Sequence, residues 1–182
     1  MEGQQANRPY WGDWFPVRER ILDHPDAQGT LILEDLPSVI DEVQEARDLG
    51  AAGVETVKYD FFSEVQPVHG ARAYYFKYVL HDWSDEKAHI IFNNLKPAMQ
   101  RGYSKLVIEV YILPDSNARP IHGMTDLAVM VLCSGVERTK QRWTNLLQSS
   151  GRHIEHMWVR EGDGLRIIKV TLPMEEQVNG SA

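Results

Sequence analysis

Apolar residues along this chain recur at two spacings, which predict strands alternating with helices. Runs rich in β-branched, aromatic and aliphatic residues predict strands at 30–34, 54–58, 71–80 and 105–112. Apolar residues three and four positions apart predict helices at 37–50, 84–100, 121–133 and 139–151. Strand and helix therefore alternate through most of the chain.

Two more strands are predicted at 153–159 and 165–172, joined by a turn rich in glycine and acidic residues. Alternation followed by a hairpin predicts a three-layer α/β fold, with a mostly parallel sheet and an antiparallel edge. We expect one domain at 15–173, between a polar and aromatic tail at 1–14 and a polar tail at 174–182.

Composition adds limits on partners and on cellular location. The 182 residues carry a net charge of −7, which argues against a nucleic-acid or anionic-membrane surface. The single cysteine, Cys133, excludes an internal disulfide and suits a reducing compartment. No apolar run reaches the length of a membrane span, and residues 1–12 are too polar for a secretory signal. We expect a cytoplasmic protein with a small-molecule partner.

The run that ends in His81 and Asp82 carries the strongest candidate chemistry. The predicted strand at 71–80 stops at this titratable pair, and the next helix begins at Ser84. Loops at the carboxyl ends of strands are where open α/β sheets bind ligands, and histidine suits proton transfer near neutral pH. The alternative is a histidine that only hydrogen-bonds its own loop.

Two acids, Asp35 and Asp60, each follow a predicted strand. A carboxylate in that position can accept hydrogen bonds from the hydroxyls of a nucleoside ribose. The alternative for each is a solvated loop acid. No spacing of histidines, cysteines and acids favours a metal site.

Residues 80–86 (Leu-His-Asp-Trp-Ser-Asp-Glu) resemble the segment with the general-base histidine in S-adenosylmethionine-dependent O-methyltransferases of the caffeic-acid type. Other motifs follow the order and spacing of that family, at residues 31–37, 59–62, 111–114 and 135–139. The resemblance extends from about residue 17 to 173 and implies a Rossmann-like class I methyltransferase fold. It also implies S-adenosylmethionine as the cofactor.

Within that resemblance, His81 matches the base that removes a phenolic proton during methyl transfer. Glu137 matches the acid that orients this histidine, because a carboxylate behind an imidazole fixes its tautomer and stabilises the imidazolium. Asp82 completes the candidate catalytic group. Without the resemblance, Glu137 is an acid placed near the start of a helix.

The resemblance also assigns residues to cofactor binding. Asp35 matches the ribose-binding acid, Asp60 with Phe61 matches the adenine-binding pair, and Lys77 matches another cofactor-side residue. The family's second acid beside the base is displaced, because Val110 stands at its position and Glu109 one residue earlier. On a strand that shift directs the carboxylate to the opposite face.

The sequence departs from the family pattern at its start. It begins at the helix after the glycine-rich cofactor loop, without the first strand or the N-terminal dimerisation domain, so we expect weak or undetectable cofactor binding. We also expect a homo-oligomer, or pairing with a homologous chain, through the aromatic cluster Tyr10, Trp11, Trp14 and Phe15.

Three functions remain open on this sequence. The first is methyl transfer to a phenol or enol of a small aromatic or polyketide-like metabolite. The second uses His81 and Glu137 for isomerisation, cyclisation or elimination without methyl transfer. The third is a non-catalytic binding or assembly partner.

Overall fold

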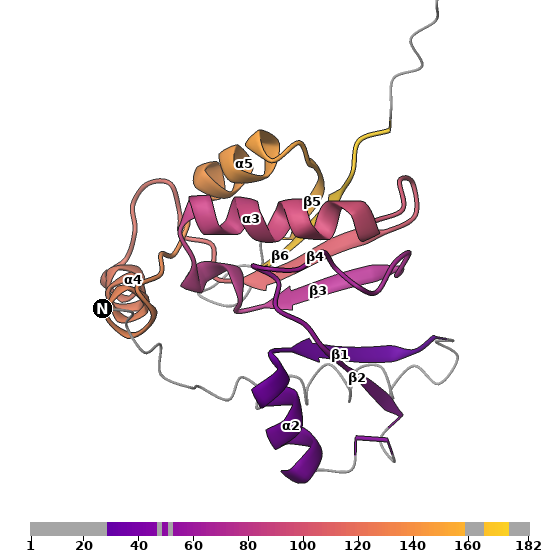
Figure 1. Ribbon diagram of the computed structural model, residues 1–182. Coiled ribbons are helices and arrows are strands. Elements are labelled where there is room, and N and C mark those ends of the chain that lie inside the picture. The colour runs from indigo at the N-terminus through magenta and orange to yellow at the C-terminus, as the bar shows by residue number, and fades with distance from the viewer. Residues whose placement is uncertain (1–28, 47–48, 51–52, 159–165, 175–182) are drawn as a thin grey trace, which may run out of the picture. The chain divides into compact units, whose positions relative to one another are not determined.

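The computed structural model describes residues 29–46, 49–50, 53–158 and 166–174 (Figure 1). The two predicted tails lie outside these residues, apart from Met174, as do the aromatic cluster at 10–15 and the turn at 161–164. The chain divides into two compact units, residues 1–60 (unit 1) and 61–182 (unit 2). Each unit is described by itself.

Unit 1 contains a β-α-β sequence: β1 (Leu31–Asp35), α2 (Pro37–Ala46) and β2 (Val54–Lys58). The two strands pair in parallel, with Leu31 opposite Val54 at one end and Asp35 opposite Lys58 at the other. Apolar residues of α2 and of the strands form a small core around Val43. The parallel register places the carboxyl ends of both strands at the same edge, which positions Asp35.

Unit 2 contains a four-stranded sheet in the order β3-β4-β6-β5. Its strands are β3 (Ala73–Lys77), β4 (Lys105–Val110), β5 (His153–Trp158) and β6 (Arg166–Thr171). β3 runs parallel to β4, whereas β6 runs antiparallel to both β4 and β5. The predicted α/β class and the antiparallel pair near the C-terminus are confirmed.

The helices α3 (Asp85–Leu95) and α5 (Lys140–Ser149) lie on the same face of this sheet (Figure 1). Leu106, Ile108 and Val110 of β4 and Ile168 and Val170 of β6 alternate along their strands and are fully buried on that face, as the period of two in a strand requires. The main core joins this face to Phe92 of α3 and Trp143 of α5. Ser84 and Thr139 cap the two helices by accepting a backbone N–H hydrogen bond.

The predicted strand at 71–80 is longer than the observed one, because β3 ends at Lys77. Tyr78 has a φ of 54°, a left-handed conformation that no β-strand continues. The chain then forms a short 3₁₀ turn, η2 (Leu80–Asp82). His81 therefore lies on a turn that leaves the sheet, four residues beyond the last residue of the strand.

The predicted helix at 84–100 is also shortened. α3 ends at Leu95 and a 3₁₀ turn, η3 (Lys96–Ala98), follows. Pro97 explains the change, since proline has no N–H to donate and its ring disrupts a helix interior. Similarly, β4 ends at Val110 rather than at residue 112.

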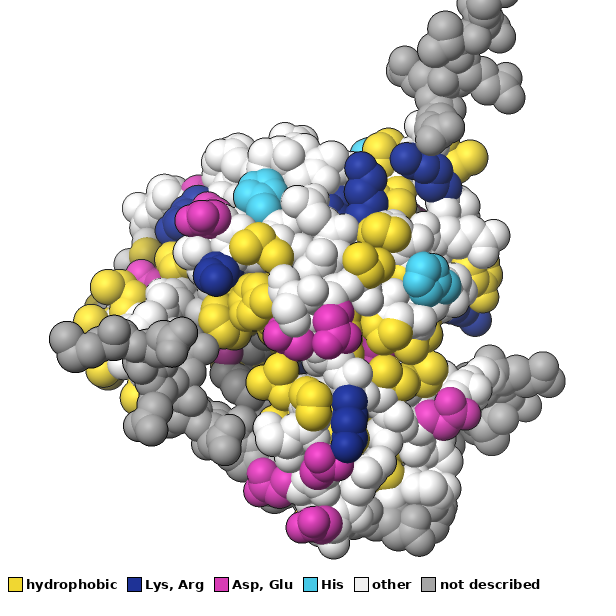
Figure 2. All heavy atoms as spheres, viewed as in Figure 1, with side chains coloured by type: hydrophobic (Ala, Val, Ile, Leu, Met, Phe, Trp, Pro, Cys, Tyr) yellow, Lys and Arg dark blue, Asp and Glu magenta, His cyan; other side chains and the backbone are white. Residues whose placement is uncertain are grey.

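The apolar helix α4 (Pro120–Cys133) differs from the other helices of unit 2 in its exposure. Val129 is the one buried residue that the helix contributes to the described structure. Apolar side chains gather over α4 at the left of Figure 2, and the strongly exposed ones are Ile121, Met124, Leu127, Met130, Val131 and Leu132. No helix in the described part of the chain is long and apolar enough to cross a membrane. Self-association stays a prediction.

Candidate functional site

The turn η2 presents His81 at the end of β3. Leu80 is fully buried and anchors the turn in the core, whereas His81 keeps 9% of its surface exposed. The ring of Tyr78 lies beside the imidazole, with centroids 5.4 Å apart. The imidazole is thus largely shielded from water but reachable from solvent.

Glu137 lies directly behind this imidazole. Its Oε1 is 2.9 Å from His81 Nδ1, although the two residues are 56 positions apart in the sequence. Glu137 is only 2% exposed, and its backbone N–H donates to Asp126 Oδ1 of α4 at 3.0 Å. Because an ionised carboxylate can only accept, this contact assigns the ring proton to Nδ1 and leaves the lone pair on Nε2.

Asp82 lies on the other side of the ring. Its Oδ1 is 3.4 Å from His81 Nε2, so a protonated imidazole has a carboxylate near each nitrogen. Glu109 does not take this place, because its Oε2 accepts a hydrogen bond from the hydroxyl of Tyr75, while Val110 points into the core. The structure therefore brings together His81, Glu137 and Asp82, the three predicted catalytic residues.

Arg138 is a residue of this site that the sequence reasoning missed. It is fully buried and donates to the backbone carbonyls of Leu80 and Trp83, at 2.8 and 2.7 Å, and to Asp85 Oδ1 at 2.7 Å. Burial lowers the pKa of Arg138, and the hydrogen bond to Asp85 partly offsets that shift. The one feature of the sequence that could have indicated Arg138 is its position next to Glu137 in the motif at residues 135–139.

The predicted ribose-binding acid, Asp35, is the last residue of β1 in unit 1. Its Oδ1 accepts a hydrogen bond from Leu36 N–H at 2.7 Å. Burial raises the pKa of Asp35, and that hydrogen bond opposes the shift. Asp60 follows β2 as the last residue of the same unit and is partly buried.

The other two predicted cofactor residues belong to unit 2. The ring of Phe61 packs edge-on against Phe62, with centroids 4.8 Å apart, and lies 6.2 Å from the ring of Trp83. Lys77 ends β3, with its ammonium 5.9 Å from the ring of Tyr78. Both residues therefore flank the turn that carries His81.

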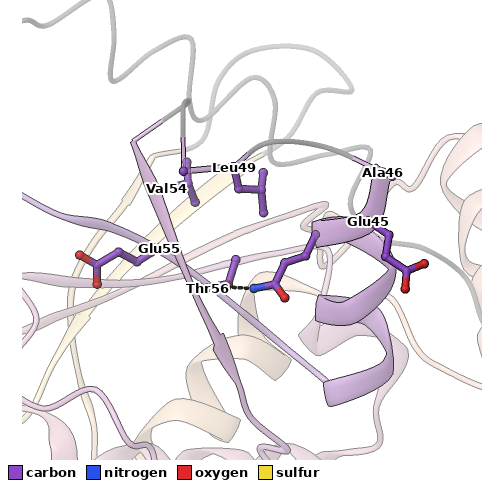
Figure 3. A pocket seen from close by; sticks show the side chains of 8 residues that line it. Glu45, Ala46, Leu49, Val54, Glu55 and Thr56 are labelled. Atoms are coloured by element: carbon purple, nitrogen blue, oxygen red, sulfur yellow. Dashed lines mark hydrogen bonds between the residues drawn. The ribbon is translucent and has the colours of Figure 1, made fainter.

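Unit 1 also contains an open hollow (Figure 3). It is lined by the end of α2, the start of β2 and the segment between them, and Gln44 Nε2 donates to Thr56 Oγ1 across it at 2.6 Å. Asp35 and Asp60 stand at the opposite, carboxyl ends of the strands. This hollow is therefore distinct from the predicted nucleoside site.

Comparison with known proteins places these features in a family. Residues 19–153 match the model of the O-methyltransferase domain. The chain is 34% identical over 189 residues to O-methyltransferase penC of Penicillium thymicola, covering 90% of this chain and 46% of penC. The chain thus spans about half the length of the curated relatives it matches.

Solved structures agree with that match. OxaC in complex with sinefungin and meleagrin has a TM-score of 0.80 at 34% identity, covering 92% of this chain and 44% of OxaC. A protein described as a pericyclic reaction enzyme has a TM-score of 0.77 at 28% identity, covering 87% and 40% of the two chains. With its α/β fold and its paired His81 and Glu137, this chain belongs to the O-methyltransferase domain family.

Proposed function

We propose that this chain provides the proton-transfer site and part of the cofactor site of an O-methyltransferase acting on a phenolic or enolic hydroxyl. The acceptor would be a small aromatic or polyketide-like metabolite of secondary metabolism. One observation carries the proposal: the contact of 2.9 Å between His81 Nδ1 and the buried Glu137. That contact leaves Nε2 free of a ring proton and able to accept the proton of a substrate hydroxyl.

In this proposal the proton moves from the hydroxyl oxygen to His81 Nε2 as the oxygen attacks the methyl group. The ring then carries a positive charge between the carboxylates of Glu137 and Asp82. Fixed carboxylates stabilise a charge that develops during the reaction without reorganising at that moment. Low exposure of the pair strengthens this effect, since electrostatic interactions are less screened away from water.

S-adenosylmethionine would supply the methyl group as an electrophile, and S-adenosylhomocysteine would be the leaving group. In unit 1, the half-buried carboxylate of Asp35 at the end of β1 is suited to the ribose hydroxyls, with Asp60 as its neighbour on the adenine side. In unit 2, Phe61 and Lys77 are the residues that the family resemblance assigns to the cofactor. Support from relatives is that OxaC was solved with sinefungin and with SAH.

The test is incorporation of label from methyl-labelled S-adenosylmethionine into a panel of phenols and polyketide-like enols. At a saturating concentration of labelled cofactor, which offsets the weak binding expected from the sequence, the wild-type chain should label at least one acceptor, and His81→Gln should label none above background. Equal labelling by the two proteins would refute the proposed base. Calorimetric titration with S-adenosylmethionine and S-adenosylhomocysteine, run beside a full-length relative, measures cofactor binding separately.

A second candidate function is acid–base rearrangement or cyclisation without methyl transfer. The similarity to a pericyclic reaction enzyme at 28% identity favours it. The same His81 and Glu137 pair would then move a proton within one substrate. Product formed without label, and abolished in His81→Gln, would select this candidate over methyl transfer.

Replacing Glu137 with glutamine should lower turnover by about tenfold. The amide oxygen still accepts from Nδ1–H, but a neutral partner gives a hydrogen bond weaker by about 1 to 1.5 kcal/mol, which corresponds to about a factor of ten in rate. Steady-state kinetics should show the loss in kcat. A loss as large as that of His81→Ala would show that the glutamate does more than support the imidazolium.

Replacing Asp35 with asparagine should stabilise unit 1 while weakening nucleoside binding. Because burial raises its pKa, the folded chain binds this proton more tightly than the unfolded chain, so ionisation of Asp35 destabilises the fold. The destabilisation is absent at pH values below the unfolded pKa and complete above the folded pKa. Asparagine keeps an oxygen for Leu36 N–H and removes the charge.

Urea unfolding should therefore show a gain of up to about 0.5 kcal/mol at neutral pH, shrinking as the pH falls towards about 3, where the wild-type carboxyl is protonated too. Calorimetry with S-adenosylhomocysteine should show weaker binding. Asp41→Asn on the exposed side of α2 is the matched control. A variant that is less stable than wild type at neutral pH would contradict the argument.

A further inference from the structure

The segment 135–138 contacts the His81 turn on several sides. Val136 N–H donates to the carbonyl of His81 at 2.8 Å. Arg138 donates to the carbonyls of Leu80 and Trp83, which bracket His81 and Asp82 in the sequence. Three backbone carbonyls of one short turn are thus bonded by a segment more than fifty residues away.

Gly135 shows how close this approach is. A Cβ atom at position 135 would lie 2.1 Å from the carbonyl oxygen of His81 and 2.7 Å from Cα of Asp82. Both neighbours are backbone atoms, which cannot move aside as a flexible side chain does. Glycine therefore permits the segment to lie against the turn, and Glu137 reaches His81 from this fixed backbone.

The guanidinium of Arg138 makes the contact specific. Its Nε donates to Asp85, its two terminal nitrogens donate to different carbonyls, and its central carbon lies 5.0 Å from the ring of Trp143. A planar fork with five donors fits such an arrangement, whereas the ammonium of lysine is a compact point charge on a flexible chain. The plane of the guanidinium thus fixes the turn relative to α3 and α5.

We propose that Arg138 is a positioning residue that sets the orientation and the tautomer of His81 by bonding the carbonyls on both sides of its turn. This inference rests on the proposed function of His81. Arg138 does not contact the imidazole in the described structure, and it acts through the backbone of the turn. Without it, the turn can rotate and His81 Nδ1 can lose its fixed alignment with Glu137.

The test compares Arg138→Lys with wild type by long-range ¹H–¹⁵N correlation of the imidazole nitrogens at about pH 8, above the ordinary histidine pKa. The seven histidines are distinguished by the signals missing in His81→Gln. Wild type should show His81 as a single tautomer with the proton on Nδ1. Arg138→Lys should show a mixture of both tautomers, and its kcat should fall by about 10²-fold, as for a misplaced catalytic group.

Arg152→Lys is the matched control. Arg152 is also buried and donates to backbone carbonyls, those of Phe92 and Ser150, and burial lowers its pKa to about 10. It makes no contact with the His81 turn in the described structure, so its replacement should destabilise the fold and leave the His81 tautomer unchanged. If the two lysine variants lose stability equally and both keep the single tautomer, the inference is wrong.

If Arg138→Lys fails to fold, Asp85→Asn takes its place in the test. This substitution weakens the contact between Arg138 Nε and Asp85 at the half-exposed start of α3. It should broaden or split the His81 signals, and unchanged signals would overturn the inference. Failure of the proposed function looks different. In that case His81→Gln forms as much product as wild type, whatever the tautomer in the arginine variant.

Discussion

His81→Ala is expected to lower turnover by roughly two to four orders of magnitude, the usual range for a positioned acid–base group. The imidazole is the group that Glu137 and Asp82 flank, and alanine leaves nothing at its place to accept a proton. His81→Gln should fail to a similar extent, since an amide can hydrogen-bond but cannot exchange a proton near neutral pH. The measurement is kcat and kcat/KM on an acceptor found in the labelling screen.

His122→Gln is the matched control, because His122 lies on α4, where its Nδ1 accepts a hydrogen bond from the backbone N–H of Arg119. It should retain most of the activity. Near-ultraviolet circular dichroism should confirm that each variant is folded. A folded His81→Ala protein with wild-type turnover would exclude His81 as the proton-transfer group in both catalytic functions.

Trp143→Ala should have the largest effect on stability, about 3 to 5 kcal/mol, as for other buried aromatic residues replaced by alanine. Trp143 is fully buried in the main core, against the sheet face that α3 and α5 cover. Its removal deletes that packing and the aromatic face beneath the guanidinium of Arg138. Small domains are stable by about 5 to 15 kcal/mol in total, so the variant should be close to unfolding.

The comparison is with Trp143→Phe in urea unfolding followed by circular dichroism. Phenylalanine keeps an aromatic ring in the core, and no described residue bonds the indole nitrogen of Trp143, so the loss should be less than half as large. An alanine variant with the wild-type unfolding midpoint would show that the ring is not part of the stabilising core.

The sequence pattern was sufficient for the α/β class because buried strands and amphipathic helices differ in the spacing of apolar residues. The pattern did not predict where the strand β3 ends, because that depends on the backbone conformation of one residue. The apolar run up to Leu80 reads as one strand, but Tyr78 adopts a positive φ and the strand ends at Lys77. Periodicity contains no signal for a single left-handed residue.

The pairing of His81 with Glu137 was predicted from the motif resemblance, since no local pattern relates residues that are 56 positions apart. Arg138 was missed for a related reason. Two of its three acceptors are backbone carbonyls, which have no sequence signature, and the third is Asp85 at a distance of 53 residues. Likewise, the apolar character of α4 indicated a helix but not whether its faces are covered.

The unequal cores of the two units have a consequence for how the protein opens. Among the described residues, the buried cluster of unit 1 has three members, whereas that of unit 2 has seventeen. Regions with few buried apolar contacts undergo subglobal opening at lower free energy than a densely packed core. Amide protons of β1 and β2 should therefore exchange with solvent sooner than those of β4 and β6, and limited proteolysis should cut unit 1 first. A protease-resistant fragment would then still contain His81 and Glu137, separated from the acid proposed to bind the ribose.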